Sequence, residues 1–200
     1  MRERITNPFT PQDKNIAVND RFGNSGIKKQ QGSSVLKYDT LPLDGRTTLN
    51  FFEGAAARNF PLSNCGSDGN KLGVGNTLVV ERLYLTILKL DRETGLLGSP
   101  DIIENAPDGT IEMGELNLSI ANSTVLKNFP VLSTVPYFNY SSGTIFESVY
   151  ELDTNIVIPP LLEYIMQLRL PAYDSTVYED LYLRLTIEGS GSLIAPRTTF

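Results

Sequence analysis

The strongest constraint on the fold is a two-residue periodicity in two segments that lie far apart in the chain. In residues 75–90 (GNTLVVERLYLTILKL) apolar side chains fall on Leu83, Leu85 and Ile87, and residues 181–189 (LYLRLTIEG) repeat the pattern. This period is typical of a half-buried β-strand, because successive side chains of a strand point to opposite faces of the sheet. We therefore expect both segments to be strands, with Leu83, Leu85 and Ile87 in the core. Their shared Leu-Tyr-Leu pattern favours one sheet.

The rest of the chain also has the short alternating segments and turn signals of a β-domain. Residues 162–170 are ambiguous, since their apolar residues fit either a helical stripe or a strand, and the flanking prolines favour the strand. No helical stretch of adequate length separates the strands, which disfavours βαβ units. The other predicted strands cover residues 47–52, 116–121, 125–135, 145–152 and 155–158, with a hairpin around 102–111. Seven or eight strands at this spacing predict an all-β fold, an antiparallel, jelly-roll-like β-sandwich over residues 49–200.

Residues 1–48 differ from the predicted sandwich in composition and charge. They are rich in Gly, Pro, Asn, Asp and Gln, and their few apolar residues bury too little surface to order the segment alone. Residues 1–46 carry eight basic and five acidic side chains, and the remainder nine basic and eighteen acidic ones, so the formal charges are +3 and −9. We predict a long, extended N-terminal arm, which either lies on a neighbouring copy or is a solvated tail.

The residue types exclude several classes of chemistry. The chain has no histidine and one cysteine, Cys65, which leaves no Ser-His-Asp or Cys-His site, no zinc framework and no internal disulfide. We expect no enzyme activity, no cofactor and no metal. Two acidic groups have alternative interpretations as sites, but both match solvated surface acids better. They are a hydrolase pair drawn from Glu112, Glu115, Asp174, Glu179 and Asp180, and a calcium site at Asp101, Glu104 and Asp108. The Gly-x-Gly before Asn76 matches a turn better than a phosphate-binding loop.

Two groups of residues are candidate contact surfaces. The loop around Tyr137, Phe138 and Tyr140 combines aromatic side chains with Ser, Asn and Gly, as recognition loops do, although the same aromatics would equally close one end of a core. The second group lies opposite the apolar positions of the two alternating segments and consists of Arg82, Tyr84, Tyr182 and Arg184.

Charge and hydropathy limit the partners and the compartment. The acidic body and the sparse basic residues of the arm disfavour nucleic-acid binding. No stretch is apolar enough for a signal peptide or a membrane span, so we expect synthesis in a cytoplasm and no membrane partner. The three Asn-x-Ser/Thr sequons, at Asn117, Asn122 and Asn139, are then expected to be chance matches.

Four stretches together carry a resemblance to a known group of proteins. They are RNFPLSN, NKLGVGNTLVVERLYLTI, VIPPLLEYIMQLRLP and YLRLTIEGSGSLIAPRTTF. Over residues 49–200 the chain resembles small virion structural proteins of tailed bacteriophages, in particular those of the crAss-like group. The resemblance implies an auxiliary or minor capsid (decoration) β-sandwich without catalytic residues, whose arm and sandwich surface bind the major capsid protein and copies of itself in a homo-oligomer. The expected location is the virion, after synthesis in the host cytoplasm. The alternative is a carbohydrate- or receptor-binding module of a phage fibre that uses residues 137–140.

Overall fold

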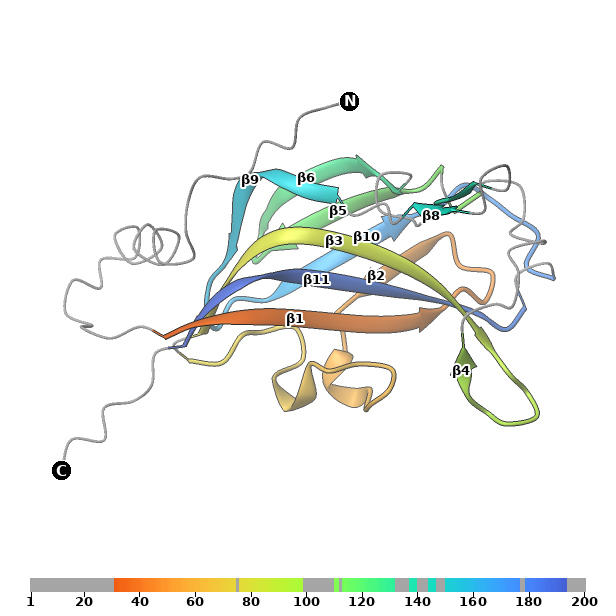
Figure 1. Ribbon diagram of the computed structural model, residues 1–200, viewed down its shortest axis with the longest axis horizontal. Coiled ribbons are helices and arrows are strands. Elements are labelled where there is room, and N and C mark those ends of the chain that lie inside the picture. Colours follow the sequence, from red (N-terminus) through yellow and green to blue (C-terminus); the bar gives the residue numbers. More distant parts are fainter. Residues whose placement is uncertain are drawn as a thin grey trace.

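The computed structural model describes residues 31–74, 76–98, 110–111, 113–131, 137–139, 144–146, 150–176 and 179–193. Most of these residues lie in β-strands that form two antiparallel sheets packed face to face (Figure 1). Two short 3-10 helices, η1 (Ala55–Ala57) and η2 (Gly66–Asp68), lie in the loop between the second and third strands. The predicted all-β sandwich is confirmed.

The two sheets, here named A and B, each take strands from both halves of the chain. Sheet A has the order β1-β11-β3, with β9 and β4 on the far side of β3, and sheet B has the order β2-β10-β5-β6. The strands of sheet A are β1 (Gln31–Pro42), β3 (Asn76–Leu90), β4 (Leu97–Gly98), β9 (Tyr150–Ile158) and β11 (Leu181–Leu193). Those of sheet B are β2 (Thr48–Phe51), β5 (Glu115–Ile120), β6 (Ser123–Pro130) and β10 (Tyr164–Arg169). A separate hairpin consists of β7 (Tyr137–Asn139) and β8 (Thr144–Phe146).

The pairing of these strands has a nested order. Counted inward from the two ends of the domain, β1 pairs with β11, β2 with β10, β3 with β9 and β5 with β6, all antiparallel. Such a chain is one long folded hairpin. Its wrapping brings β11 against β3 and β10 against β5 and so produces the two sheets of a jelly roll. The pairing of β3 with β11 also confirms that the two alternating segments share a sheet.

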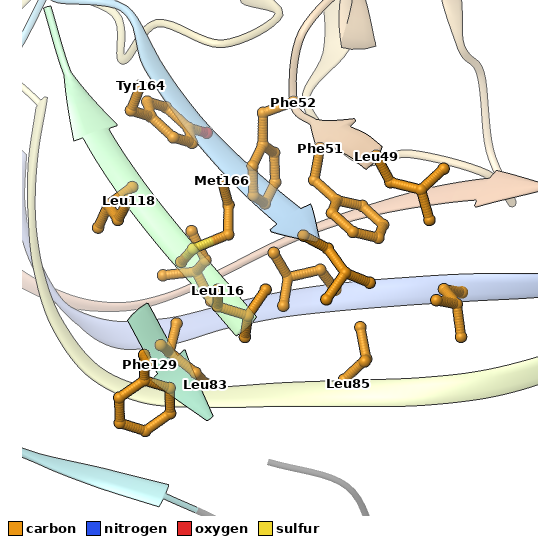
Figure 2. Close-up of a cluster of buried hydrophobic side chains, with 14 of the residues drawn as sticks. Leu49, Phe51, Phe52, Leu83, Leu85, Leu116, Leu118, Phe129, Tyr164 and Met166 are labelled. Atoms are coloured by element: carbon orange, nitrogen blue, oxygen red, sulfur yellow. The ribbon is translucent and has the colours of Figure 1, made fainter. Parts of the chain in front are cut away.

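The hydrophobic core fills the space between the two sheets (Figure 2). Leu83 and Leu85 are fully buried as predicted, and Ile87 is partly buried against the core. In β10 the alternating residues Tyr164, Met166 and Leu168 have no exposed surface, which confirms the strand at residues 162–170. Side chains from both sheets interdigitate here, so this layer supplies most of the apolar burial that stabilises the domain.

The sandwich begins earlier in the chain than the arm boundary at residue 48 suggests. Strand β1, within the segment assigned to the arm, pairs with β11 along its whole length, from Gln31 opposite Leu193 to Pro42 opposite Tyr182. Leu41 and Leu43 belong to the core. The segment orders because β11 supplies both hydrogen-bond partners and apolar cover, which the segment lacks by itself. Residues 1–30 of the predicted arm lie outside the described residues.

A β-bulge interrupts the centre of sheet A. The register of β3 against β11 shifts between Glu188 and Gly189, which leaves Glu81 as the extra residue of β3. A Cβ atom on Gly189 would overlap the backbone carbonyl of Val79. Glycine at this position therefore permits the close approach of the two backbones at the bulge.

Candidate interaction surface

The outer face of sheet A, which points away from the core, collects side chains from three long strands. The register places Tyr38, Thr186 and Tyr84 side by side in one row across β1, β11 and β3. The next row contains Thr40, Arg184 and Thr86. These residues occupy the positions that alternate with the inward-facing core residues of each strand. The two-residue period of a strand therefore places them together on the outer face. The four candidates Arg82, Tyr84, Tyr182 and Arg184 all lie on it.

Charged groups on this face are paired with one another. Arg82 lies 3.8 Å from Glu188, between the Nη1 and Oε1 atoms, and the Tyr84 hydroxyl hydrogen-bonds to the same carboxylate. The carboxylate on β11 thus holds two side chains of the neighbouring strand β3. Cross-strand pairs of this kind stabilise a sheet by a few tenths of a kcal/mol to about 1 kcal/mol each.

Arg184 connects the face to the loop between β2 and β3. Its guanidinium carbon lies 4.6 Å from the centre of the Tyr38 ring, which is cation–π geometry. Its Nε donates to the Thr40 hydroxyl over 3.0 Å, and its Nη2 donates to the carbonyl of Pro61 over 2.8 Å. Arg184 is therefore fixed in place by contacts within the molecule.

The same loop covers the free edge of β1. The Asn64 side chain accepts a hydrogen bond from the Tyr38 N–H and donates one to the Leu36 carbonyl, both over 2.8 Å. Next along the loop, Ser63 forms an antiparallel bridge with Asp39. An amide side chain thus takes the place of a neighbouring strand. This cover hinders pairing of another chain with the part of the β1 edge between Leu36 and Asp39.

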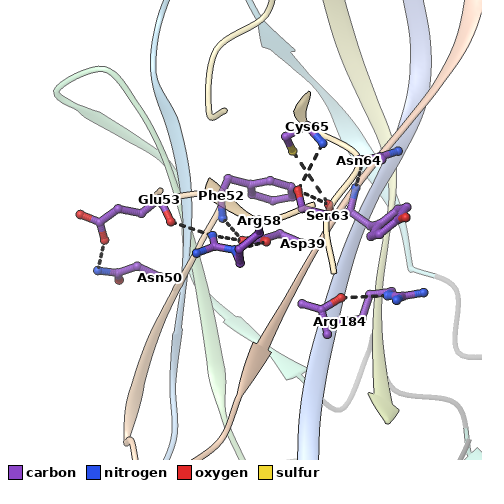
Figure 3. A network of polar contacts seen from close by, with 11 residues as sticks. Asp39, Asn50, Phe52, Glu53, Arg58, Ser63, Asn64, Cys65 and Arg184 are labelled. Carbon is purple, nitrogen blue, oxygen red and sulfur yellow. Dashed lines mark hydrogen bonds and ion pairs between the residues drawn. The ribbon is translucent and has the colours of Figure 1, made fainter. Parts of the chain in front are cut away.

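A buried ion pair anchors the start of the loop to β1 (Figure 3). Asp39 has no exposed surface, and its carboxylate accepts hydrogen bonds from Arg58 Nε (2.7 Å), Arg58 Nη2 (2.6 Å) and the Phe52 N–H (2.6 Å). The guanidinium also donates to the Glu53 carbonyl over 2.7 Å. This bidentate geometry compensates for the desolvation of the carboxylate and fixes the loop on the sandwich.

Two further ionisable groups are buried close to this anchor. Burial raises the pKa of the Cys65 thiol and strongly raises the pKa of the Tyr164 hydroxyl. Among the described residues, the hydroxyl of Tyr164 has no hydrogen-bond partner of ordinary geometry. Both groups are therefore neutral at physiological pH, and the thiol is inert because the thiolate is the reactive form.

Two of the remaining candidate contact residues lie in the β7–β8 hairpin, and the third lies outside the described residues. Tyr137 and Phe138 lie in β7, which pairs with β8, but their side chains, like all of Tyr140, are outside the described parts. Sequence reasoning missed three residues of the surface, Leu36 and Tyr38 on β1 and Phe60 in the covering loop. Phe60 is 84% exposed and Leu36 is 47% exposed, so both are among the large apolar side chains that the described structure leaves in contact with solvent. The alternation of Leu36, Tyr38 and Thr40 was the available signal.

Three of the acidic candidates have polar partners in the described structure. Glu179 and Asp180 form ion pairs with Arg92 (2.7 and 2.6 Å) beside a hollow of about 650 Å³. Hydrogen bonds from Thr176 lower the pKa of Asp174, which is exposed. No described cluster of three or more His, Cys, Asp or Glu side chains has the geometry of a metal site. The residues Asp101, Glu104, Asp108 and Glu112 are outside the described ranges.

Comparison with protein-family models, with curated proteins and with solved structures finds no match. Within the described residues, no helix has the length and apolar character needed to span a bilayer. The fold and the surface together define a jelly-roll β-sandwich with one aromatic sheet face.

Proposed function

We propose that this chain is a non-enzymatic structural protein of a virus particle, an auxiliary or minor capsid component of a tailed bacteriophage that binds neighbouring subunits. The observation that carries the proposal is the nested strand pairing of the jelly roll, an architecture that viral capsid domains use repeatedly. One fold serves many functions, so the composition of the surface has to distinguish between them. The resemblance of residues 49–200 to phage virion proteins points the same way.

Surface chemistry favours an assembly role over the sugar-binding role that lectin jelly rolls also have. The hollow of about 410 Å³ beside η1 and η2 is lined mainly by small and polar side chains, including Ala55, Ala56 and Ser67, without an aromatic platform for a sugar ring. The exposed Leu36 lies instead on the outer face of sheet A, next to half-buried tyrosines, and the exposed Phe60 lies in the loop beside it. A face of this type suits contact with another protein.

The test is the protein content of purified particles. We expect the chain to co-purify with phage particles through a density gradient, at a fixed ratio to the major capsid protein when measured by quantitative mass spectrometry. A non-virion enzyme of the same phage, measured in the same fractions, controls for contamination. If the chain stays in the soluble lysate and its particle-associated amount is no greater than that of the control, the proposed function is wrong.

A further inference from the structure

We propose that the outer face of sheet A, rimmed by Phe60, is a self-association surface on which a second copy of this chain docks face to face. This inference rests on the proposed function and names one of the partners. The surface, here called the aromatic face, is made of side chains from β1, β11 and β3. Its members are Leu36, Tyr38, Tyr84, Tyr182, Leu88 and Phe60, with Arg82, Arg184 and Glu188 between them.

The two outer faces of the sandwich differ in composition. On sheet B the outward positions of β5, β10 and β2 carry mostly polar side chains, among them Asn117, Ser119, Gln167 and Asn50, beside the apolar Ile165, which is close to the pattern of a face in water. On sheet A the corresponding rows carry Tyr, Leu and Thr and, among the described residues of the aromatic face, no Lys or Asp. Enrichment in Tyr and Arg with depletion of Lys and Asp is the composition of a protein–protein interface.

Three of the described sheet edges, those of β1, β2 and β6, carry features that hinder pairing with another chain. Asn64 and Ser63 occupy the edge of β1, and β2 has only 4 residues. The β6 edge carries Lys127, ends at Pro130 and is interrupted by Asn128, whose φ is 51°. Short strands, proline, lysine and irregular backbone are the devices that prevent edge-to-edge addition.

The aromatic face is already rigid and matches a second copy of itself. Arg184 is held by Tyr38, Thr40 and Pro61, and Arg82 is held by Glu188, so docking orders few additional side chains. Arg82 and Glu188 lie on adjacent strands. A two-fold axis therefore can set Arg82 of one copy against Glu188 of the other, which is the self-complementarity of an isologous interface.

The size of the aromatic face fits a small, weakly associating dimer interface. Its sheet members lie within seven residues of each strand, 182–188 on β11. At about 3.3 Å per residue and about 4.8 Å between strands, three strands of that length present on the order of 330 Å². The loop with Phe60, whose side chain is 84% exposed, adds to this area, which stays below the roughly 800 Å² per partner of a standard interface.

The test compares the molar mass of the full chain and of its variants by size-exclusion chromatography with light scattering, between about 1 and 100 µM, the range of moderate affinities. We expect a concentration-dependent dimer for the unchanged chain. The double variant Leu36→Lys with Phe60→Ser should stay monomeric over this range. Position 36 lies directly opposite Glu188 on β11, so the introduced ammonium group gains a favourable cross-strand partner and the sheet is preserved.

Controls separate this proposal from folding defects and from the proposed function. Val125, 45% exposed on β6 of the other sheet, gives the matched variant Val125→Lys, which should dimerise like the unchanged chain. A Tm within about 2 °C of that of the unchanged chain, a difference worth no more than about 1 kcal/mol, verifies that each variant is folded. A monomeric unchanged chain at every concentration, or a dimer unaffected by the double variant, overturns the self-association proposal. Because particle incorporation is measured separately, a monomer that still enters particles leaves the proposed function standing.

Discussion

Replacement of Arg58 by methionine should destabilise the domain far more than replacement of a surface partner. Asp39 is completely buried and accepts two of its three hydrogen bonds from Arg58. Without the guanidinium a buried carboxylate keeps only the Phe52 N–H. Loss of one partner of a buried ion pair costs about 3–5 kcal/mol. For a chain of this length, each kcal/mol lowers Tm by about 2–4 °C, so even the lower figure predicts a fall of roughly 6–12 °C.

The assay is urea unfolding followed by circular dichroism, with two comparison variants. Lys71 and Glu163 form an ion pair at 3.2 Å whose side chains are 46% and 58% exposed, and Lys71→Met should cost no more than about 1 kcal/mol. The double variant Asp39→Asn with Arg58→Met should be more stable than Arg58→Met alone, because it removes the uncompensated charge and keeps an acceptor for Phe52. The reasoning is refuted if Arg58→Met is as mild as Lys71→Met, or if the added Asp39→Asn change lowers the stability further.

Three further predictions concern the bulge, the buried hydroxyl and the start of the sandwich. Gly189→Ala should destabilise by about 1–3 kcal/mol or more, since the new methyl group meets backbone and not a movable side chain, and urea unfolding measures the loss. Tyr164→Phe should leave stability at neutral pH unchanged or higher, because it removes an unpaired buried hydroxyl. Because the pKa values of Tyr164 and Cys65 are raised in the folded state, both groups ionise at a lower pH in the unfolded chain, and the free energy of unfolding should fall above about pH 9. The fall with pH should be less steep in Tyr164→Phe, and an equally steep fall in both proteins would contradict this. Deletion of residues 1–30 should leave a domain that circular dichroism shows to be folded. Deletion of residues 1–46 also removes β1 and should unfold the domain; a folded domain after both deletions would show that β1 is not needed for folding.

The two alternating segments could be predicted because their inward positions are uniformly apolar. Leu83 and Leu85 on β3 and Leu183 and Leu185 on β11 are all fully buried, so the period of two is visible without any neighbour. The same alternation correctly placed Arg82, Tyr84, Tyr182 and Arg184 on one outer face. The nested pairing of the strands is a non-local property, which local periodicity does not contain.

Strand β1 escaped prediction because its inward row is mixed. Val35, Lys37, Asp39 and Leu41 occupy the alternate positions, and the charges at the second and third of them break the binary pattern of a half-buried strand. The compensation for Asp39 comes from Arg58, in a loop beyond the next strand. Such a pair is recognisable only once the loop is folded back on the sheet. Phe60 was missed for the same reason, since its exposure depends on that loop.

The buried ion pair and the aromatic face are linked through this loop. Arg58 fixes the loop to Asp39. Further along the loop, the Pro61 carbonyl accepts a hydrogen bond from Arg184, and the Asn64 side chain binds the β1 edge. Phe60 lies between these anchors, so its position at the rim of the face follows from theirs. Loss of the Arg58 contact should therefore loosen the loop before the core, and we expect Arg58→Met to weaken self-association at temperatures where the domain is still folded. Dimerisation of Arg58→Met with unchanged affinity would show that the face binds without the loop.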